Sequence, residues 1–448
     1  MASAAEQLAA NLNWGSIGKA TELKKRLWFT VGALVVFRIG AYIPVPGVDP
    51  AALAEIFAAN AGGIAGMLDV FSGGSIGRMS ILALSIMPYI SASIIMQILT
   101  TVVPSLEALK KEGEAGRKKI NQYTRYGTVA LAAFQAYGIA IGLESQTASV
   151  GPVVHDPGLF FRFVTVVTLV GGTLFLMWLG EQITARGVGN GISLIIFAGI
   201  VAALPSALVQ TLELGRTGAL SALFIIALAV GVVVVVAVVV FIETAQRRIV
   251  VQYPKRQVGN RMYGGEASHL PLKINTAGVI PPIFASSLLL FPATIASFQG
   301  NTGEGGVMQW IATYLAHGQP LYLLTYIALI VFFCFFYTTV VFNPNDTAEN
   351  LKKNGGFIPG IRPGKNTAEY LESILNRLTV IGAIYLSAVC ILPELLIARG
   401  GVPFYFGGTS LLIVVSVTLD TVTQIQAHLL AHQYEGLIKK ARLRGRGR

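Results

Sequence analysis

Apolar stretches of about 20 residues recur along the whole chain, and this limits what the chain can fold into. A helix of that length spans the hydrocarbon core of a bilayer. Of the 448 residues, 54% are hydrophobic and only 12% are charged, whereas soluble domains carry about 25% charged residues. The chain is therefore predicted to be an all-α polytopic membrane protein.

Ten transmembrane helices are predicted. The first five cover residues 27–46, 79–103, 124–143, 159–180 and 191–211, and the second five cover 219–242, 276–297, 320–342, 378–398 and 406–427. A short link, residues 212–218, separates the two sets. An odd number of spans in each set gives the sets opposite topology, as in an inverted repeat.

The predicted units are an N-terminal half (1–211), a C-terminal half (219–427) and a basic tail (428–448). Under this symmetry, span two corresponds to span seven. PYISAS (88–93) and PPIFAS (281–286) share Pro, Ile, Ala and Ser at matching offsets. Both combine helix-breaking Pro with Ser hydroxyls that can satisfy freed backbone groups. The functional interpretation is two mobile walls of one central site, and the alternative is the shared composition of membrane helices.

The basic residues are distributed unevenly between the two sides of the membrane. Of the 33 Lys and Arg residues, 28 lie in or at the edge of the N-terminal segment, the even-numbered loops and the C-terminal tail. Cytoplasmic loops carry the excess of Lys and Arg, so both termini are predicted to be cytoplasmic. The N-terminus has no apparent removable signal peptide.

Residues 62–78, GGIAGMLDVFSGGSIGR, precede span two and are too short and Gly-rich to cross a bilayer. They are predicted either to lie on the outer surface or to re-enter the membrane, and re-entry would imply a cavity. GGSIG (73–77) also matches the G-x-S-x-G elbow of serine hydrolases. That motif needs a strand–turn–helix context with a nearby His and acid, which the sequence does not indicate.

Other chemical motifs are weaker. His428 and His432 have metal-ligand spacing but no third ligand nearby, which favours a solvated pair. Cys334 and Cys390 lie in apolar stretches and predict neither a disulfide nor a metal site. GVGNG (187–191) lacks the Lys-Ser/Thr of a phosphate loop and is predicted to be a tight turn. We expect no cofactor, no metal and no catalytic residue.

An ion-coupled transporter is the main alternative, because inverted repeats and broken helices are typical of that class. Coupling requires ionisable groups at membrane depth. The candidates are Arg38 in span one and Asp420 near the end of span ten, whereas the centres of spans two and seven hold none. A pore for a bulky, chemically varied substrate fits this lining better. Saturable uptake of one solute by the chain alone would favour the transporter.

Two long basic loops, residues 243–275 and 343–377, lie on the predicted cytoplasmic side. Loops longer than about 12–15 residues are usually functional or disordered. Orientation of the chain by positive charge is the simpler interpretation. Docking of an acidic protein or an RNA-rich particle is the functional one.

Several ordered motifs resemble the SecY family, whose members are the central subunit of the bacterial protein-conducting channel. They include IMPYISASI, RYG, GEQIT, GNGIS, QRRIVVQY, FASS, LFPATIA, GIRPG and GGTSLLIVV. The resemblance runs from about Trp14 to the C-terminal tail. It implies two five-helix halves around a central pore, a plug at about residues 64–78, and a lateral gate between spans two and seven.

The resemblance also implies roles for individual residues. The pore ring would be Ile86, Ile90, Ile192, Ile196, Ile283 and Ile413. The plug would include Ile64, Met67, Leu68, Val70, Phe71, Ser72, Gly73 and Gly74. The lateral gate would include Ser91, Ser93, Pro282, Ser286, Ser287 and Phe291, with Ser91 facing Phe291 across the closed gate. Docking would use Arg247, Arg248, Lys255, Arg256, Arg261, Lys352, Lys353, Arg362 and Lys365.

The implied partners follow from the family. They are the membrane subunits SecE and SecG, the motor ATPase SecA, the ribosome, signal sequences, nascent polypeptides, membrane lipid and accessory insertion factors. The implied activity is translocation of unfolded secretory polypeptides across the bacterial inner membrane, and insertion of membrane proteins into it. Energy would come from SecA or the ribosome, and the chain itself would not be an enzyme.

The turn GIRPG (360–364) gives a first test. Its Gly and Pro residues are expected to direct the Arg362 guanidinium outward, where it can bind carboxylate or phosphate in a bidentate manner. Arg362→Glu should leave membrane insertion intact and abolish SecA-driven translocation into reconstituted vesicles. Transport at the parental rate would contradict the docking role.

Overall fold

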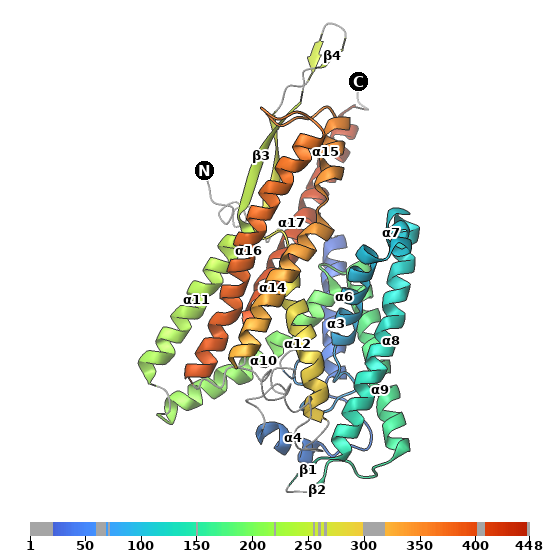
Figure 1. Cartoon of the computed structure of the whole chain (residues 1–448), viewed down its shortest axis with the longest axis vertical. Helices are drawn as coiled ribbons and strands as arrows, with labels where there is room; N and C mark the ends of the chain where they lie inside the picture. Colours follow the sequence, from blue (N-terminus) through green and yellow to red (C-terminus); the bar gives the residue numbers. More distant parts are fainter. Residues whose placement is uncertain are drawn as a thin grey trace.

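A computed structural model describes residues 21–59, 69, 72–148, 151–218, 221–253, 256–258, 261–263, 267–298, 319–400 and 408–445 (Figure 1). Each of the ten predicted spans overlaps a helix. In chain order these helices are α3 (Thr21–Gly40), α6 (Met87–Val102), α8 (Glu114–Glu144), α9 (Leu159–Arg186), α10 (Gly191–Arg216), α11 (Ala222–Thr244), α12 (Ile280–Phe298), α14 (Pro320–Val341), α16 (Lys365–Gly400) and α17 (Gly408–Gly445).

Many of these helices are apolar enough to cross a bilayer. Within the described residues, seven are long and apolar enough to span a membrane. An eighth span results if α6 is counted together with α7 (Pro104–Lys111), from which it is bent by 97°. The prediction of a helical polytopic membrane protein is therefore confirmed.

The remaining elements gather at the two ends of the helix array (Figure 1). One end, which we call the hairpin end, carries α15 (Pro344–Lys353) and four strands, β3 (Gln246–Gln252), β4 (Arg256–Val258), β5 (Arg261–Tyr263) and β6 (Ala267–Lys273). The other end, the α4 end, carries α4 (Pro50–Ala59), β1 (Thr147–Ala148) and β2 (Gly151–Pro152). The strands form antiparallel pairs β1–β2, β3–β6 and β4–β5, so the connections contain sheet that the all-α prediction did not include.

The first helix lies closer to the N-terminus than predicted, and the second is shorter than predicted. The α3 helix ends at Gly40, and residues 79–86, predicted to be helical, form turns before α6. The two segments pair with each other, because the Val45 amide donates to the Met79 carbonyl at 2.8 Å and the Ile81 amide donates to the Ile43 carbonyl at 2.9 Å. Tertiary pairing thus replaces the last turns of one helix and the first turns of the next.

Other boundaries also differ from prediction. Most of the predicted link 212–218 is helical, because α10 continues to Arg216. The predicted loop 343–377 contains α15, and α16 already begins at Lys365. The matched prolines do not break helices internally. Pro88 lies in the first turn of α6, and Pro281 and Pro282 lie in the first turn of α12, where the missing N–H costs no helical hydrogen bond.

Close backbone contacts hold the turn segment before α6 against α9. A Cβ atom added to Gly172 of α9 would lie 1.9 Å from the Ile81 carbonyl oxygen. The neighbouring Gly171 is exposed, and a Cβ atom there would meet nothing within 4 Å. Gly172 is therefore a contact position, and Gly171 is its natural control.

Gly172→Ala should lower stability by about 1–3 kcal/mol, because an extra methyl group in a packed site forces its surroundings to shift. Gly171→Ala should be neutral or slightly stabilising, since Ala favours helix by about 1 kcal/mol over Gly. Thermal unfolding of the two variants in mild detergent measures the difference. Equal midpoints would contradict the proposed packing.

Candidate functional site

The six isoleucines predicted to form a ring all belong to the largest buried apolar cluster or pack against it. Ile86, which immediately precedes α6, and Ile90 within it belong to the largest buried cluster, as do Ile196 of α10 and Ile413 of α17. Ile192 of α10 and Ile283 of α12 are half-buried and pack against the same cluster. The Ile90 amide donates to the Ile86 carbonyl at 3.1 Å, so these two residues follow each other on one helical face.

A four-residue turn positions the two isoleucines of α10, and it confirms the tight turn predicted at GVGNG. Asn190 caps α10 by accepting from the amides of Ile192 and Ser193. The Gly189 amide donates to Gln424 of α17 at 2.9 Å, and the Val188 amide donates to Thr30 of α3 at 3.1 Å. Contacts to two other helices thus fix the entry of the chain into α10.

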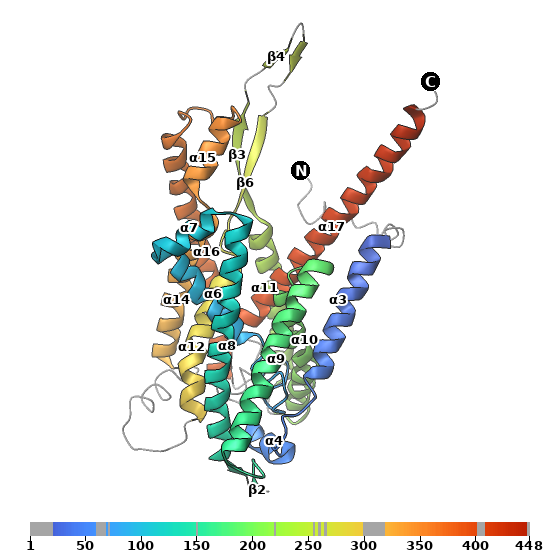
Figure 2. The same cartoon turned by 90° about the vertical axis from the view of Figure 1, so that its right-hand side faces the viewer.

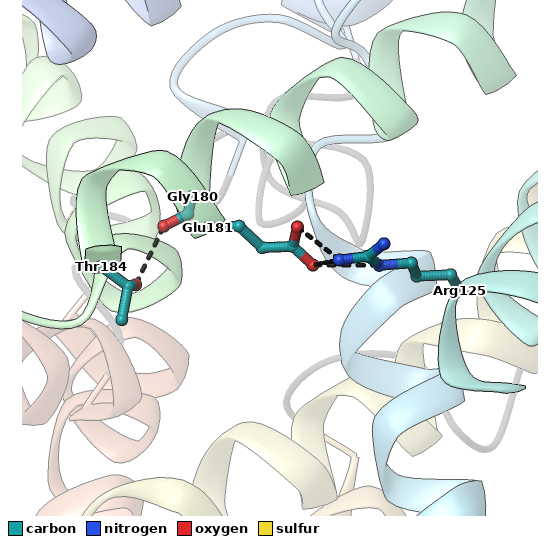
Figure 3. Close-up of polar contacts among 4 residues, drawn as sticks. All are labelled: Arg125, Gly180, Glu181 and Thr184. Carbon is teal, nitrogen blue, oxygen red and sulfur yellow. Dashed lines mark hydrogen bonds and ion pairs between the residues drawn. The ribbon is translucent and has the colours of Figure 1, made fainter. Parts of the chain in front are cut away.

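The preceding helix fits closely against this turn. Thr184 donates to the Gly180 carbonyl at 2.9 Å and accepts from the Gly191 amide at 2.8 Å (Figure 3). A Cβ atom added to Gly180 would lie 3.2 Å from Cγ1 of Ile192. The absence of a side chain at Gly180 therefore sets the position of the ring residue Ile192.

An ion pair joins α8 and α9 beside this junction. Arg125 of α8 binds both carboxylate oxygens of Glu181 of α9, with Nη2 distances of 2.8 and 2.7 Å (Figure 3). Both side chains are partly exposed, with relative areas of 49% and 35%. Because exposed pairs contribute about 1 kcal/mol or less, the pair's value lies in orienting the two helices.

The described part of the predicted plug, Asp69 and residues 72–78, forms a compact turn. The Asp69 carboxylate accepts from the Gly77 amide at 2.7 Å, and its carbonyl accepts from the Gly74 amide at 2.8 Å. Ser72 Oγ accepts from the amides of Ser75 and Ile76. Side chains thus satisfy amides that a helix would otherwise pair.

Other predicted plug residues, Ile64, Met67, Leu68, Val70 and Phe71, lie outside the described residues. Ser75, the serine of the possible hydrolase elbow, is fully buried at 0% exposure. Its hydroxyl is therefore out of reach of a substrate.

The plug turn lies against α10 and α3. Gly73, with φ of +69°, is close enough to α10 that an added Cβ atom would lie 2.9 Å from the Gly199 Cα atom. Arg38 of α3 donates to the Gly73 carbonyl at 2.6 Å. The guanidiniums of Arg38 and Arg78 lie 5.0 and 4.1 Å from the Tyr42 ring centroid, a cation–π arrangement. The turn therefore contacts α10 at Gly199, three residues after the predicted ring residue Ile196.

The helices of the predicted gate are neighbours, since α12 packs against both α6 and α8 (Figure 2). The Ser287 hydroxyl lies 3.9 Å from the Met87 sulfur across the α6–α12 contact. Ser286 and Ser287 both donate to the Ile283 carbonyl, at 3.0 and 2.7 Å, which is a carbonyl of the same helix and not one that Pro281 or Pro282 leaves unpaired.

The other predicted gate residues fall into three groups. Ser91 and Ser93 are half-buried on α6, and Pro282 is buried at the start of α12. Phe291 lies on α12, and its side chain lies outside the description. The structure thus brings α6 and α12 together and leaves the predicted Ser91–Phe291 pair untested.

The two predicted docking loops form one unit at the hairpin end. Strands β3 and β6 pair in register from Gln246 opposite Lys273 to Gln252 opposite Ala267. Gln252 and Phe357 exchange backbone hydrogen bonds of 2.9 and 3.0 Å. One apolar cluster contains residues from both loops, namely Ile249, Leu272, Ile358, Leu371, Ile374, Leu375 and Leu378. We call this assembly the docking unit.

Its basic residues lie on the outside. The predicted docking residues whose side chains are described are all exposed, namely Arg247, Arg248, Lys352, Lys353, Arg362 and Lys365. Positive φ at Gly360 and Gly364 brackets Arg362, while Ile361 beside it packs on the apolar cluster. Arg256 and Arg261 lie on β4 and β5, and Lys255 lies outside the described residues.

Sequence reasoning missed three features. The Arg125–Glu181 pair could have been suspected, because ionisable residues within apolar spans usually pair. Arg38 was noted only as a charge, and its partner is a backbone carbonyl that no pattern indicates. The hydrogen bond between Asn275 and Glu243, 2.7 Å long, also had no signal. Within the described residues, no group of three or more His, Cys, Asp or Glu could hold a metal ion.

Both the sequence and the fold of this chain match known proteins. The SecY family model matches residues 80–422. The protein translocase subunit SecY of Rickettsia conorii is 58% identical over 423 residues, covering 94% of this chain and 97% of that protein. The same subunit of Escherichia coli strain K12 is 57% identical over 435 residues, covering 96% and 97%.

Solved structures share the fold. One is a SecY protein whose plug domain stabilises the closed state of the translocation channel, with a TM-score of 0.65 at 20% identity over 91% of this chain and 92% of that one. Another is Sec61 in the canine ribosome-channel complex, with a TM-score of 0.62 at 19% identity and the same coverage. The chain therefore belongs to the SecY family, and it is a multi-pass subunit of the bacterial Sec protein-conducting channel rather than an enzyme.

Proposed function

We propose that α6, α10, α12 and α17 surround the translocation pore, and that the six isoleucines form its constriction. The observation that carries this proposal is that one buried cluster contains four of the six isoleucines and has the other two packed against it, although they come from four separate places in the chain. Branched apolar side chains can close around a passing polypeptide without binding any one sequence. Neither α6 nor α12 contains an acidic or basic residue, which disfavours coupling to an ion.

The turn around Asp69 and residues 72–78 acts as the plug of this pore. Support comes from its contact with α10 near Ile196 and from the hydrogen bond that Arg38 donates to it. A related SecY protein, similar in fold, has a plug domain that maintains a membrane seal. In the idle channel, the plug and the ring together would exclude ions.

The hairpin end lies in the cytoplasm of a bacterial cell with its inner membrane around the helices, and both termini are on that side. The excess of basic residues there supports this orientation. The exposed Arg and Lys residues of the docking unit would bind acidic groups of SecA or phosphates of the ribosome. The related canine channel is seen in a ribosome complex. SecE, SecG, signal sequences, nascent chains, lipid and insertion factors complete the proposed partners.

The plug can be tested at Asp69. Asp69→Ala removes the acceptor of the Gly77 amide, and leaving a buried donor unpaired costs about 1–3 kcal/mol. We expect idle channels in planar bilayers to open about 5- to 150-fold more often, since that is the ratio these energies correspond to.

Asp69→Asn is the matched control, because its amide oxygen can still accept from Gly77. Burial raises the pKa of the Asp69 carboxyl, so loss of the charge should not loosen the turn. Deletion of residues 64–74 sets the maximal leak. Parental conductance in both Asp69→Ala and the deletion would refute the seal.

The lateral gate can be tested with a disulfide. Cysteines replacing Met87 and Ser287, with Cys334 and Cys390 changed to Ala, should oxidise in the idle channel, provided that their Cα atoms lie within about 7 Å. The locked channel should lose secretion and membrane insertion, and reductant should restore both.

A second cysteine pair at Ser91 and Phe291, expected from the family resemblance, reports the register of the two helices. A longer flexible crosslinker at either pair should permit partial activity, because it lets the helices separate. Full activity of a completely oxidised channel would place the exit path elsewhere.

A further inference from the structure

The segment that joins the docking unit to the gate helix is held by polar contacts to two other helices, α11 and α14. Residues 274–279 connect β6 to α12. Within it, Asn275 is 3% exposed, and its Nδ2 donates to the Glu243 carboxylate at 2.7 Å and to the Gly278 carbonyl at 3.0 Å. Glu243 lies in the last turn of α11 and is itself buried.

A hydroxyl chain holds the next residue. Thr276 Oγ1 lies 3.3 Å from Thr338 Oγ1 of α14, and Thr379 of α16 donates to the same Thr338 oxygen at 3.3 Å. The Ile274 amide donates to the Ala245 carbonyl just after α11 at 3.1 Å. The segment is therefore fixed to α11 and α14 at residues 274–276, and α14 is joined to α16 by the Thr379–Thr338 bond.

Two residues after Thr276, the backbone takes a conformation that favours glycine. Gly278 has φ of +64°, and an added Cβ atom there would meet nothing within 4 Å. Glycine adopts this conformation without steric cost, and the free space permits rotation. Gly278 thus separates a fixed anchor from the helix that packs against α6.

We propose that Asn275 is a positioning residue of the gate. It clamps the start of α12 to α11, so that displacement of the docking unit is converted into rotation of α12 about Gly278 and away from α6. This inference rests on the proposed gate between α6 and α12. It adds the route by which a docked partner reaches that gate.

The experiment measures the distance between α6 and α12 by pulsed electron resonance. Spin labels at the exposed positions Ile95 and Leu288, with both native cysteines changed to Ala, report the spacing in nanodiscs. Spectra are recorded for the idle channel and after addition of SecA with a non-hydrolysable ATP analogue. In the parent, the distance between the two labels should be longer when SecA is bound.

Asn275→Ala removes both hydrogen bonds of the clamp. We expect its idle distribution to shift toward the SecA-bound one, and SecA to produce less than half of the parental change, while SecA affinity stays unchanged. Glu243→Ala should act in the same direction. Glu243→Gln keeps an acceptor for Asn275 and should behave like the parent.

Thr244→Ala is the control for a nearby loss of packing, since Thr244 bonds only to carbonyls of its own helix. If the Asn275 variant does not fold, the comparison of Glu243→Ala with Glu243→Gln decides the question. A parental SecA response in Asn275→Ala or Glu243→Ala would overturn the clamp and leave the gate intact. No SecA response in the parent itself would remove both the gate and the clamp.

Discussion

The backbone of residues 73–86 is not helical, yet it lies among helices, so its polar groups need partners within the protein. In a membrane, irregular backbone is tolerated only against protein or a water-filled cavity. Here Asp69 and Ser72 bind the amides of the plug turn, Arg38 binds a carbonyl, and residues 43–45 pair with residues 79–81. The proposed plug, the shortened α6 and the C-terminal end of α3 all depend on meeting this requirement.

Glycines allow close packing of the backbone around the proposed pore. Gly180 and Gly191 bring α9 and α10 into backbone contact, and Gly199 receives the plug turn. Each allows a close approach that a side chain would prevent. Gly180 of α9 lies directly against Ile192, so a glycine on a neighbouring helix positions this isoleucine, whose own chemistry is only that of a branched apolar group.

Much of the fold could be predicted, because a bilayer imposes one length and one composition on each span. The ten apolar runs and the turn at GVGNG both follow from local sequence. The start of α6 did not, since pairing with residues 43–45 is a tertiary effect. The strand β3 could have been found, because Ile249 and Val251 alternate with exposed neighbours in QRRIVVQ.

The site was harder to predict than the fold. Nothing in the sequence distinguishes Ile86 or Ile413 from any other membrane isoleucine, so the ring depended on family resemblance. Arg38, Asn275 and Glu243 bind partners far away along the chain, and such pairs have no spacing rule. A charge in an apolar span, as at Arg38, signals only that some partner exists.

The last helix, α17, runs without interruption from the buried cluster that contains Ile413 to the hairpin end. Ile413 lies in its second turn and Gly445 at its far end. At 1.5 Å per residue, about 48 Å of rigid rod separates those two residues. If Ile413 belongs to the proposed pore ring, a force on the tail acts on that ring through a lever arm longer than the bilayer is thick. The leverage is large, so a small sideways movement at Ile413 corresponds to a much larger one at the C-terminal end.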